Sequence, residues 1–300
     1  MEYYLGIDGG GTKTTASVCD GDGKIIYTTV GKTLNFRSVP MSEVRQNLDA
    51  IINDIYRNIG KVIFENVFIG CSALDDKADE NLIHSLCDGI INSKKTEMNS
   101  DVYVALFSGD CNAPRGVVIC GTGSMAVGID RNGKITVKGG WGHIIGDGGS
   151  AYSIAVNALS RVAVMYDENK KDKPLLKATL DFFKVKSLRE IIDTVYSETA
   201  SKDSLAAFAK VVSDECKKGD KVACDVLSEE CDKILKTAFS LADETEGCEI
   251  IYLYGGVFQN NEFFKNMFVE RFCEKYPNIK VELLTVTPAE GALKAARGIK

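Results

Sequence analysis

The sequence is poor in histidine, tryptophan and proline, and it lacks long apolar runs. It contains two histidines, one tryptophan and five prolines among 300 residues. Two histidines are too few for a metal cage built from imidazoles. No apolar run reaches the roughly 18 residues of a transmembrane helix, and there is no charged-then-apolar leader. We therefore expect neither a membrane span nor a secretory signal.

Dense basic runs are absent as well. The formal net charge is −6, and basic residues cluster only in short pairs such as Lys94-Lys95. Binding to duplex nucleic acid needs a clustered positive face, so nucleic acid is excluded as a partner. A phosphate site in this chain must use local backbone dipoles and a metal ion.

The ten cysteines are scattered, and no two have the C-x-x-C spacing. Cys19, Cys71 and Cys120 lie in apolar, strand-like runs, where cysteine acts as a small core residue. With no export signal, the sequence predicts a cytoplasmic protein whose cysteines are reduced.

Two glycine loops dominate what is present. Asp8-Gly9-Gly10-Gly11-Thr12-Lys13 and Gly121-Thr122-Gly123-Ser124 each follow an apolar run. Glycine lets successive N–H groups converge on an anion without interference from Cβ, and Thr or Ser adds a hydroxyl donor. A pair of tight β-turns is the simpler alternative, but two loops in matched surroundings favour a polyphosphate ligand.

The surroundings of the loops repeat. Each loop is followed by a strand-like run, an Asp-x-x-Gly-Lys turn and a further strand, and the turns are residues 20–24 and 130–134. The Asp-Gly and Asn-Gly pairs predict β-hairpins. The pattern indicates an internal duplication. It also excludes a Walker loop and a Rossmann fingerprint, since both of those lead into a helix.

Apolar spacing predicts further elements. Helices are expected at residues 39–60, 79–91 and 102–107, with strands at 67–70 and 96–100. The segment 149–246 is mostly helical, with helices at about 149–167, 174–183, 187–197, 203–218 and 220–245. Strands at 249–254 and 280–284 then alternate with a helix after Asn260 and a last helix from Pro288. The best domain boundary lies at residues 112–116.

The motifs and their order resemble the BadF/BadG/BcrA/BcrD ATPases, in particular the N-acetylglucosamine kinase branch of the actin–hexokinase–Hsp70 superfamily. The resemblance rests on both glycine loops, Gly139–Asp147 and Gly255-Gly256-Val257-Phe258. It implies an α/β protein of two ribonuclease-H-like domains, with ATP and sugar in a central cleft. The expected domains are 1–113, with the last helix 288–300 packed on it, and 114–287, with the helical insertion 149–246.

The resemblance also implies roles for single residues. Asp8 is expected to hold Mg²⁺ through water. The ATP-binding residues are expected to be Gly10, Gly11, Thr12, Lys13, Gly121, Thr122, Gly123, Ser124, Gly255 and Gly256. For the last two, a simple strand-to-helix turn is the alternative.

Asp101 matches the catalytic aspartate of the family, which orients the attacking hydroxyl and accepts its proton. A plain helix N-cap is the alternative, and Ser100 can share that task. The family usually has adjacent Asn and Asp here, whereas Ser100 separates Asn99 from Asp101.

The sugar is expected to contact Asn35, Gly140, Trp141 and Asp147. For Trp141, a core anchor is the alternative, and His143 is expected to be structural. The family commonly has Gly-Asp-Glu-Gly-Ser where this chain has Gly148 in place of the glutamate. The sugar's identity therefore stays open.

The resemblance implies an ATP-dependent kinase that phosphorylates N-acetylglucosamine or N-acetylmuramic acid at the 6-hydroxyl, with glucosamine or a hexose as further options. The partner is a small sugar, and a homodimer is common in the family. One rival is an ATPase that activates a 2-hydroxyacyl-CoA dehydratase or benzoyl-CoA reductase, which needs an iron–sulfur cluster. The other is a sugar-sensing repressor, disfavoured because the sequence shows no helix-turn-helix or cysteine-rich zinc site.

Overall fold

The chain forms two compact units in the computed structural model. The structure describes residues 1–74, 77–109, 112–170, 173–197 and 201–298. The first unit is Met1–Ala113 with Leu284–Lys300, and the second is Pro114–Leu283. None of the helices in these described ranges is long and apolar enough to cross a membrane.

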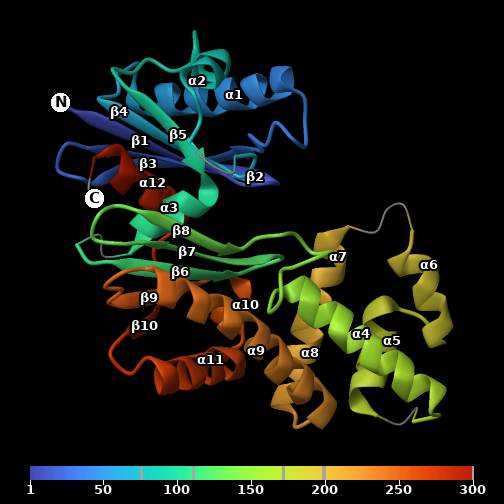
Figure 1. The fold of residues 1–300 in the computed structure, drawn as a ribbon. Coiled ribbons are helices and arrows are strands. Elements are labelled where there is room, and N and C mark those ends of the chain that lie inside the picture. Colours follow the sequence, from blue (N-terminus) through green and yellow to red (C-terminus); the bar gives the residue numbers. More distant parts are fainter. Residues whose placement is uncertain (75–76, 110–111, 171–172, 198–200, 299–300) are drawn as a thin grey trace. The chain divides into compact units, whose positions relative to one another are not determined.

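The first unit is a five-stranded sheet with helices on both faces (Figure 1). Its strands lie in the order β3 (Ile25–Lys32), β2 (Lys13–Asp20), β1 (Tyr3–Gly9), β4 (Asn66–Cys71) and β5 (Thr96–Ser100). Its helices are α1 (Met41–Ile59), α2 (Glu80–Cys87), α3 (Asp101–Ser108) and α12 (Pro288–Ala296).

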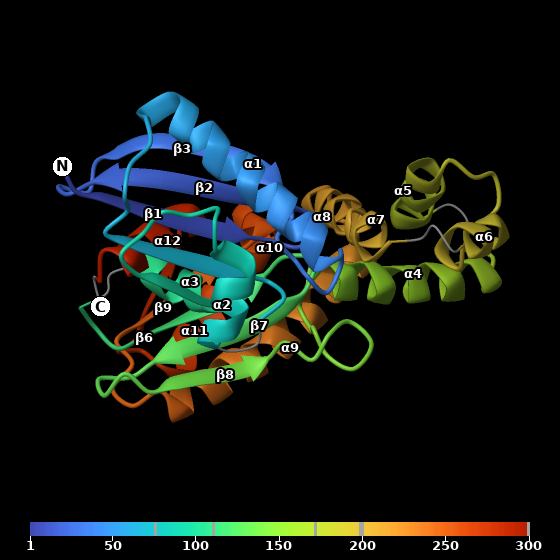
Figure 2. The same ribbon diagram turned by 90° about the horizontal axis from the view of Figure 1, so that it is seen from above.

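Side chains of β1 alternate between the two faces, as a pleated strand requires. Leu5 and Ile7 are fully buried in a core shared with Val44 and Leu48 of α1. Figure 2 shows α1 lying over β2 and β3. Gly6 faces the other way, toward α12, and a Cβ on it would lie 2.3 Å from the Leu293 backbone nitrogen. The last helix therefore packs directly against the β1 backbone.

The second unit has a sheet with the strand order β10 (Lys280–Leu283), β9 (Ile250–Tyr254), β6 (Arg115–Cys120), β7 (Ser124–Ile129) and β8 (Ile135–Gly139). The segment between β8 and β9 carries α4 (Ala151–Asp167), α5 (Pro174–Phe183), a 3₁₀ turn (Leu188–Glu190), α6 (Ile191–Val195), α7 (Lys202–Ala206), α8 (Phe208–Lys217) and α9 (Lys221–Glu244). Two helices follow β9, namely α10 (Gly256–Asn260) and α11 (Glu262–Lys275).

Two expected helices are each divided in the structure. The segment 187–197 forms a 3₁₀ turn and the short α6, and 203–218 is divided into α7 and α8 at Ala207. The helix α10 after Gly255 was not expected. Apolar spacing misses these breaks because each piece keeps a helical pattern.

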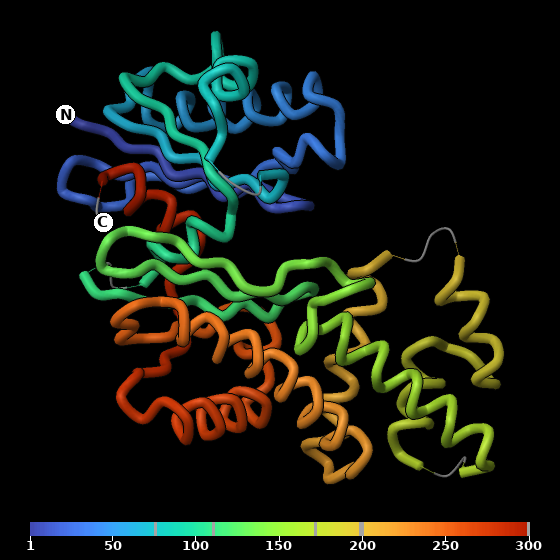
Figure 3. The backbone as a smooth tube through the Cα atoms, viewed as in Figure 1, coloured from blue at the N-terminus to red at the C-terminus, as the bar shows by residue number. Residues whose placement is uncertain are grey.

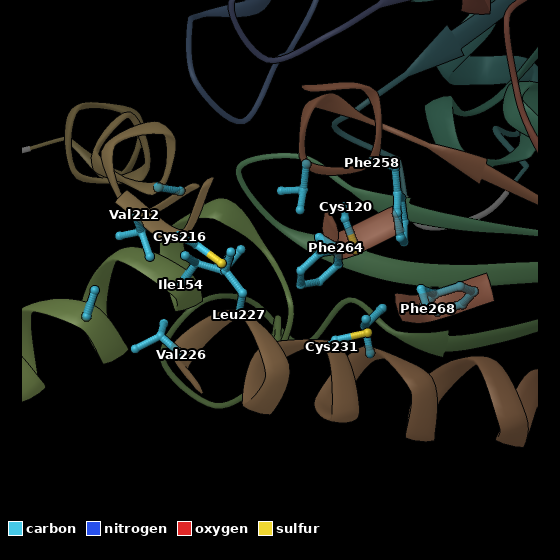
Figure 4. Close-up of a cluster of buried hydrophobic side chains, with 14 of the residues drawn as sticks. Cys120, Ile154, Val212, Cys216, Val226, Leu227, Cys231, Phe258, Phe264 and Phe268 are labelled. Atoms are coloured by element: carbon cyan, nitrogen blue, oxygen red, sulfur yellow. The ribbon is translucent and has the colours of Figure 1, made fainter. Parts of the chain in front are cut away.

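The core of the second unit joins one sheet face to α4, α8, α9, α10 and α11 (Figure 4). Cys120, the last residue of β6, is fully buried near Phe258 and Phe264. Cys19 and Cys71 are also buried, so the prediction that these three cysteines are core residues is confirmed.

One cysteine expectation was wrong. Cys216, near the end of α8, forms a disulfide with Cys224, in the first turn of α9. Their Cα atoms lie 4.8 Å apart because the chain reverses between these two helices. Their eight-residue separation gave no sign of the pairing, since it matches no short cysteine motif.

The internal duplication is confirmed down to single hydrogen bonds. In each unit, the first three strands form an antiparallel meander, and the fourth strand pairs in parallel with the first (Figure 3). Asp20 Oδ1 accepts from the N–H groups of residues 22 and 24, and Asp130 Oδ1 accepts from residues 132 and 134. This is the expected ribonuclease-H-like topology, present twice.

Strand direction determines where the loops gather. In the first unit, β1, β3, β4 and β5 all end at one edge of the sheet. In the second unit, β6, β8, β9 and β10 do the same. Ligands of α/β sheets bind at the carboxyl ends of strands, so each unit offers one edge for chemistry.

The Gly6 contact predicts a sharp loss of stability in Gly6→Ala. The new methyl group would meet the α12 backbone, which cannot move aside as a flexible side chain would. We expect a loss of about 3 kcal/mol in the free energy of unfolding, measured with urea. Gly11→Ala is the control, because a methyl group on Gly11 would meet no atom within 4 Å. Equal stability of the two variants would contradict the packing of α12 on β1.

Candidate functional site

Two carboxylates lie at the carboxyl edge of the first sheet. Asp8, near the end of β1, is paired with Gly70 of β4, and Gly70 is paired with Asn99 of β5. Asp101 begins α3 just beyond β5, and a Cβ on Gly70 would lie 3.4 Å from the Asp101 Cα. The absence of a side chain at residue 70 lets α3 pack close to β4, since a Cβ there would lie only 2.4 Å from Val104 Cγ2.

Burial shapes the charge of this edge. Burial and, second to it, the nearby charge of Asp101 together raise the pKa of Asp8 to about 6, although the charge of Lys13 opposes both effects. Burial also raises the pKa of Asp101, although backbone N–H groups at the start of α3 act against the shift. The pKa values of both acids thus lie closer to neutral pH than those of free carboxyl groups.

Asp101 is not the cap of its helix. The Ser100 side chain accepts a hydrogen bond from the Tyr103 N–H at 3.3 Å, which makes Ser100 the N-cap of α3. The N-cap explanation for Asp101 is therefore removed. The catalytic role stays a prediction.

Asn35 lies at the same edge, in the loop after β3. Its Nδ2 donates to Ser72 Oγ at 3.1 Å, just after β4. Thr33 Oγ1 donates to the Gly10 carbonyl at 2.8 Å, which ties the Asn35 loop to the first glycine loop. The fold thus brings Asp8, Gly10, Asn35 and Asp101 to one edge of the first unit.

The first glycine loop is open to solvent. Gly11, Thr12 and Lys13 are exposed, and Gly10 is half-buried. The Lys13 charge acts on Asp8, so the loop and the acid are near neighbours.

In the second unit, the glycine turn is fastened to the run after β8. Ser124 Oγ donates to the Gly148 carbonyl at 2.8 Å. The Gly140 N–H donates to the Ser124 carbonyl, and the Ala151 N–H donates to the Gly121 carbonyl. The Ser124 hydroxyl therefore braces the two loops in this structure. Its predicted phosphate contact stays a prediction.

Asp147 and Trp141 differ in their surroundings. Asp147 is buried in a left-handed backbone conformation, φ 57°, and its Oδ2 accepts from Lys202 Nζ at 2.9 Å. Trp141 is 73% exposed, so it is not a core anchor. His143 packs edge-on against the Tyr152 ring, with centroids 4.8 Å apart.

A buried glutamate on α9 supports the loop that carries Asp147. Glu230 of α9 is fully buried, and its Oε2 accepts from the Gly149 N–H at 2.9 Å. Burial would raise its pKa, but hydrogen bonds from Lys233, Ser153, Gly149 and Asn157 outweigh burial and lower it. Glu230 is thus a charged anchor for the entry into α4.

A pocket of about 710 Å³ opens beside the glycine turn. It is lined by parts of α4, α7, α8 and α10 together with Gly121, Thr122 and Gly256. Its polar side includes Asp203, Lys210, Ser213, Asp214, Lys217, Asn260 and Asn261. The volume and mixed lining suit a small organic ligand with polar groups.

The two glycines after β9 have different reasons to be glycine. Gly255 has φ 105°, and a Cβ on it would lie 2.4 Å from the Cys120 carbonyl oxygen. The chain's own packing therefore requires Gly255. The space at the Cβ position of Gly256 is almost empty, since only the Asn260 side chain lies near it, at 3.5 Å. Gly256 also lines the pocket.

The donor set at the first edge suits a magnesium ion. Carboxylate oxygens are the hard ligands that Mg²⁺ prefers, and it is commonly bound through one or two of them. A cation bound there would also lower the raised pKa values of these two half-buried acids. The metal role of Asp8 stays a prediction.

Sequence reasoning missed several residues of both edges. Ser72 follows a predicted strand, so the rule that parallel strands end together could have found it. The pocket residues of α8 and the Lys202 partner of Asp147 carry no local motif. Only the packing of α7 and α8 beside the glycine turn brings them there.

The chain matches a known protein family along nearly its whole length. The model of the BadF/BadG/BcrA/BcrD ATPase family matches residues 5–296. The chain belongs to this family.

Curated relatives of this BadF/BadG/BcrA/BcrD family member are kinases. The N-acetylmuramic acid/N-acetylglucosamine kinase of Clostridium acetobutylicum is 28% identical over 302 residues, covering 99% of both chains. The N-acetyl-D-glucosamine kinase of Dictyostelium discoideum is 26% identical over 316 residues, covering 100% of this chain and 99% of the relative.

Solved structures support the fold of this family member. A protein from Chromobacterium violaceum, provisionally assigned as an N-acetylglucosamine kinase, gives a TM-score of 0.77 at 20% identity, with 98% of each chain covered. The ROK hexokinase of Thermus thermophilus gives 0.62 at 16% identity, covering 98% of this chain and 97% of that one.

The raised pKa of Asp8 predicts that Asp8→Asn stabilises the protein at pH 7.5 in the absence of divalent metal. The pKa of Asp8 is about 6 in the folded protein and 3.8 in a free carboxyl group. The folded state therefore binds more protons between these values, and the protein loses stability as the pH rises through them. We expect a gain on the order of 1–2 kcal/mol in urea unfolding at pH 7.5 and none at pH 4, where the wild-type carboxyl is protonated. A gain that persists at pH 4 would contradict this origin.

The glycine pair after β9 predicts a split between stability and binding. Gly256→Ala should unfold like the wild type, because its methyl group meets only a flexible side chain. The same methyl group would project from the lining of the pocket, so the variant should bind nucleotide at least about tenfold more weakly. Gly255→Ala is the matched variant and should lose about 3 kcal/mol of stability through its clash with the Cys120 carbonyl. Calorimetric titration and urea unfolding measure both. Unchanged nucleotide affinity in Gly256→Ala would show that the pocket is not the binding site.

Proposed function

We propose that this protein is an ATP-dependent kinase of an amino sugar. It transfers the γ-phosphoryl group of ATP to a hydroxyl of N-acetylglucosamine or N-acetylmuramic acid, at C6. The proposal is carried by the pair of half-buried acids, Asp8 and Asp101, in a chain that matches amino sugar kinases over 99% or more of its length.

Asp101 is the proposed general base. Its carboxylate accepts the proton of the sugar hydroxyl as the new O–P bond forms and the bond between the γ-phosphorus and the bridging oxygen of ADP breaks. Burial raises its pKa, which brings the carboxyl closer to the pH at which it must take up a proton. Ser100 holds the start of α3 and so fixes the place of Asp101.

The nucleotide is proposed to use both glycine loops. Gly10, Gly11, Thr12 and Lys13 contact the phosphates in the first unit, and Gly121, Thr122, Gly123 and Ser124 contact them in the second. The adenosine occupies the pocket lined by Gly256. Mg²⁺, held by Asp8, would neutralise part of the charge on the transferred group.

The sugar is proposed to contact Asn35, Gly140, Trp141 and Asp147. The exposed indole of Trp141 offers a flat face of the kind that stacks on a pyranose ring. Asn35 keeps a polar side chain at the same edge as Asp101. Gly148, in place of a glutamate, takes away one polar group and leaves the choice of amino sugar to the shape of this region.

The decisive test is ADP release from Mg-ATP with a panel of sugars. The panel is N-acetylglucosamine, N-acetylmuramic acid, glucosamine, glucose and N-acetylmannosamine. We expect turnover that depends on the first or second sugar, with a product phosphorylated at C6, and a fall in kcat of about 10³-fold in Asp101→Asn. The value of kcat/KM for Mg-ATP should also fall as the pH drops through about 6, because a proton on Asp8 of the free enzyme competes with the metal.

Asp49→Asn serves as the control, since Asp49 is an exposed acid on α1 of the same unit. It should keep the wild-type rate. Sugar-independent hydrolysis of ATP, or full activity of Asp101→Asn, would overturn the proposal.

A further inference from the structure

A lysine absent from every motif lies at the second glycine loop. Lys202, the first residue of α7, donates from Nζ to Asp147 Oδ2 at 2.9 Å, although 55 residues separate them in sequence. The Asp147 side chain is 5% exposed and that of Lys202 is 31% exposed. The Asp147 end of the pair is therefore buried, whereas part of the Lys202 side chain faces solvent.

The ion pair touches the glycine turn itself. A Cβ on Gly123 would lie 2.8 Å from Asp147 Oδ2 and 3.1 Å from Lys202 Nζ. The ammonium group thus lies against the backbone of the turn. Asp203, the next residue, lines the pocket together with Gly121 and Thr122. Lys202 is therefore beside the end of the pocket that the glycine turn forms.

We propose that Lys202 binds the polyphosphate of the nucleotide at the turn Gly121–Ser124, and that Asp147 positions it. This inference rests on the proposed function, because it assigns the phosphates of ATP to the second glycine loop. It adds a side-chain cation to the second glycine loop, where the residues predicted from the sequence offer only backbone N–H groups and hydroxyls.

The chemistry of the pair supports this assignment. A lysine ammonium has three donors, and Asp147 takes one of them. Among the residues that the structure describes, no second acceptor for this ammonium is found. The remaining protons can therefore go to phosphate oxygens. The hydrogen bond to the buried carboxylate also restricts the rotamers of the lysine, which lowers the entropic cost of binding.

The pair also gives Gly123 a structural reason to be glycine. Any side chain at residue 123 would displace Asp147 or Lys202 from its place at the turn. A second ion pair, Lys233 with the buried Glu230, lies at the same loop, and the Lys233 side chain lies beside Gly148 rather than the turn. This makes Lys233 a matched control.

The test measures binding by calorimetric titration with ATP, adenosine and inorganic tripolyphosphate. Lys202→Met should lower the affinity for ATP and for tripolyphosphate by about tenfold or more, which is the loss expected for one charge-assisted hydrogen bond. The affinity for adenosine should stay unchanged. Lys202→Arg should recover part of the loss. Asp147→Asn should weaken the same two ligands less than Lys202→Met does, and Lys233→Met should bind all three ligands like the wild type.

The outcomes separate this inference from the proposed function. If the wild type binds no ATP, the proposed function fails and the inference fails with it. If the wild type binds ATP and Lys202→Met binds it equally well, the inference alone is overturned. It is also overturned if Lys202→Met lowers the affinities for adenosine and for tripolyphosphate to the same extent. The substitution would then have changed the pocket rather than a phosphate contact.

Discussion

The direction of the strands is the constraint on which both candidate sites depend. In each sheet, the first, third, fourth and fifth strands end at the same edge, so residues far apart in sequence meet there. In one unit, Asp8 lies near the end of β1, and Asn35, Ser72 and Asp101 follow β3, β4 and β5. The turn after β6, the run after β8 and Gly256 after β9 do the same in the other. A single backbone topology therefore supplies two edges for binding.

The duplicated backbone carries different chemistry in its two copies. The first edge gathers acids whose raised pKa values favour a metal ion or a proton. The second gathers a glycine turn, a roomy pocket and a lysine paired with a buried acid. The duplication preserves the hairpins and their Asp-x-x-Gly turns, because those residues serve the backbone. The residues after the strand ends differ between the two copies.

Stability and function compete at these edges. Burying Asp8 and Asp101 beside each other costs folding free energy that well-separated carboxylates would not cost. The second unit offsets similar costs with hydrogen bonds, since Glu230 is fully buried yet keeps a lowered pKa. Glycines divide in the same way. Gly6 and Gly255 are needed by the chain's own packing, whereas Gly121 and Gly256 leave space that a ligand can use.

The sequence by itself determined the duplication, the two glycine loops and most helices and strands, because hydrophobic period and turn residues are local signals. Family resemblance supplied the expected acids and the expected ligand. Tertiary structure alone decided that Ser100 rather than Asp101 caps α3, that Trp141 is exposed, that Cys216 pairs with Cys224, and that Lys202 reaches Asp147. These depend on how helices pack beside strand ends, and such long-range contacts leave no periodic trace in the chain.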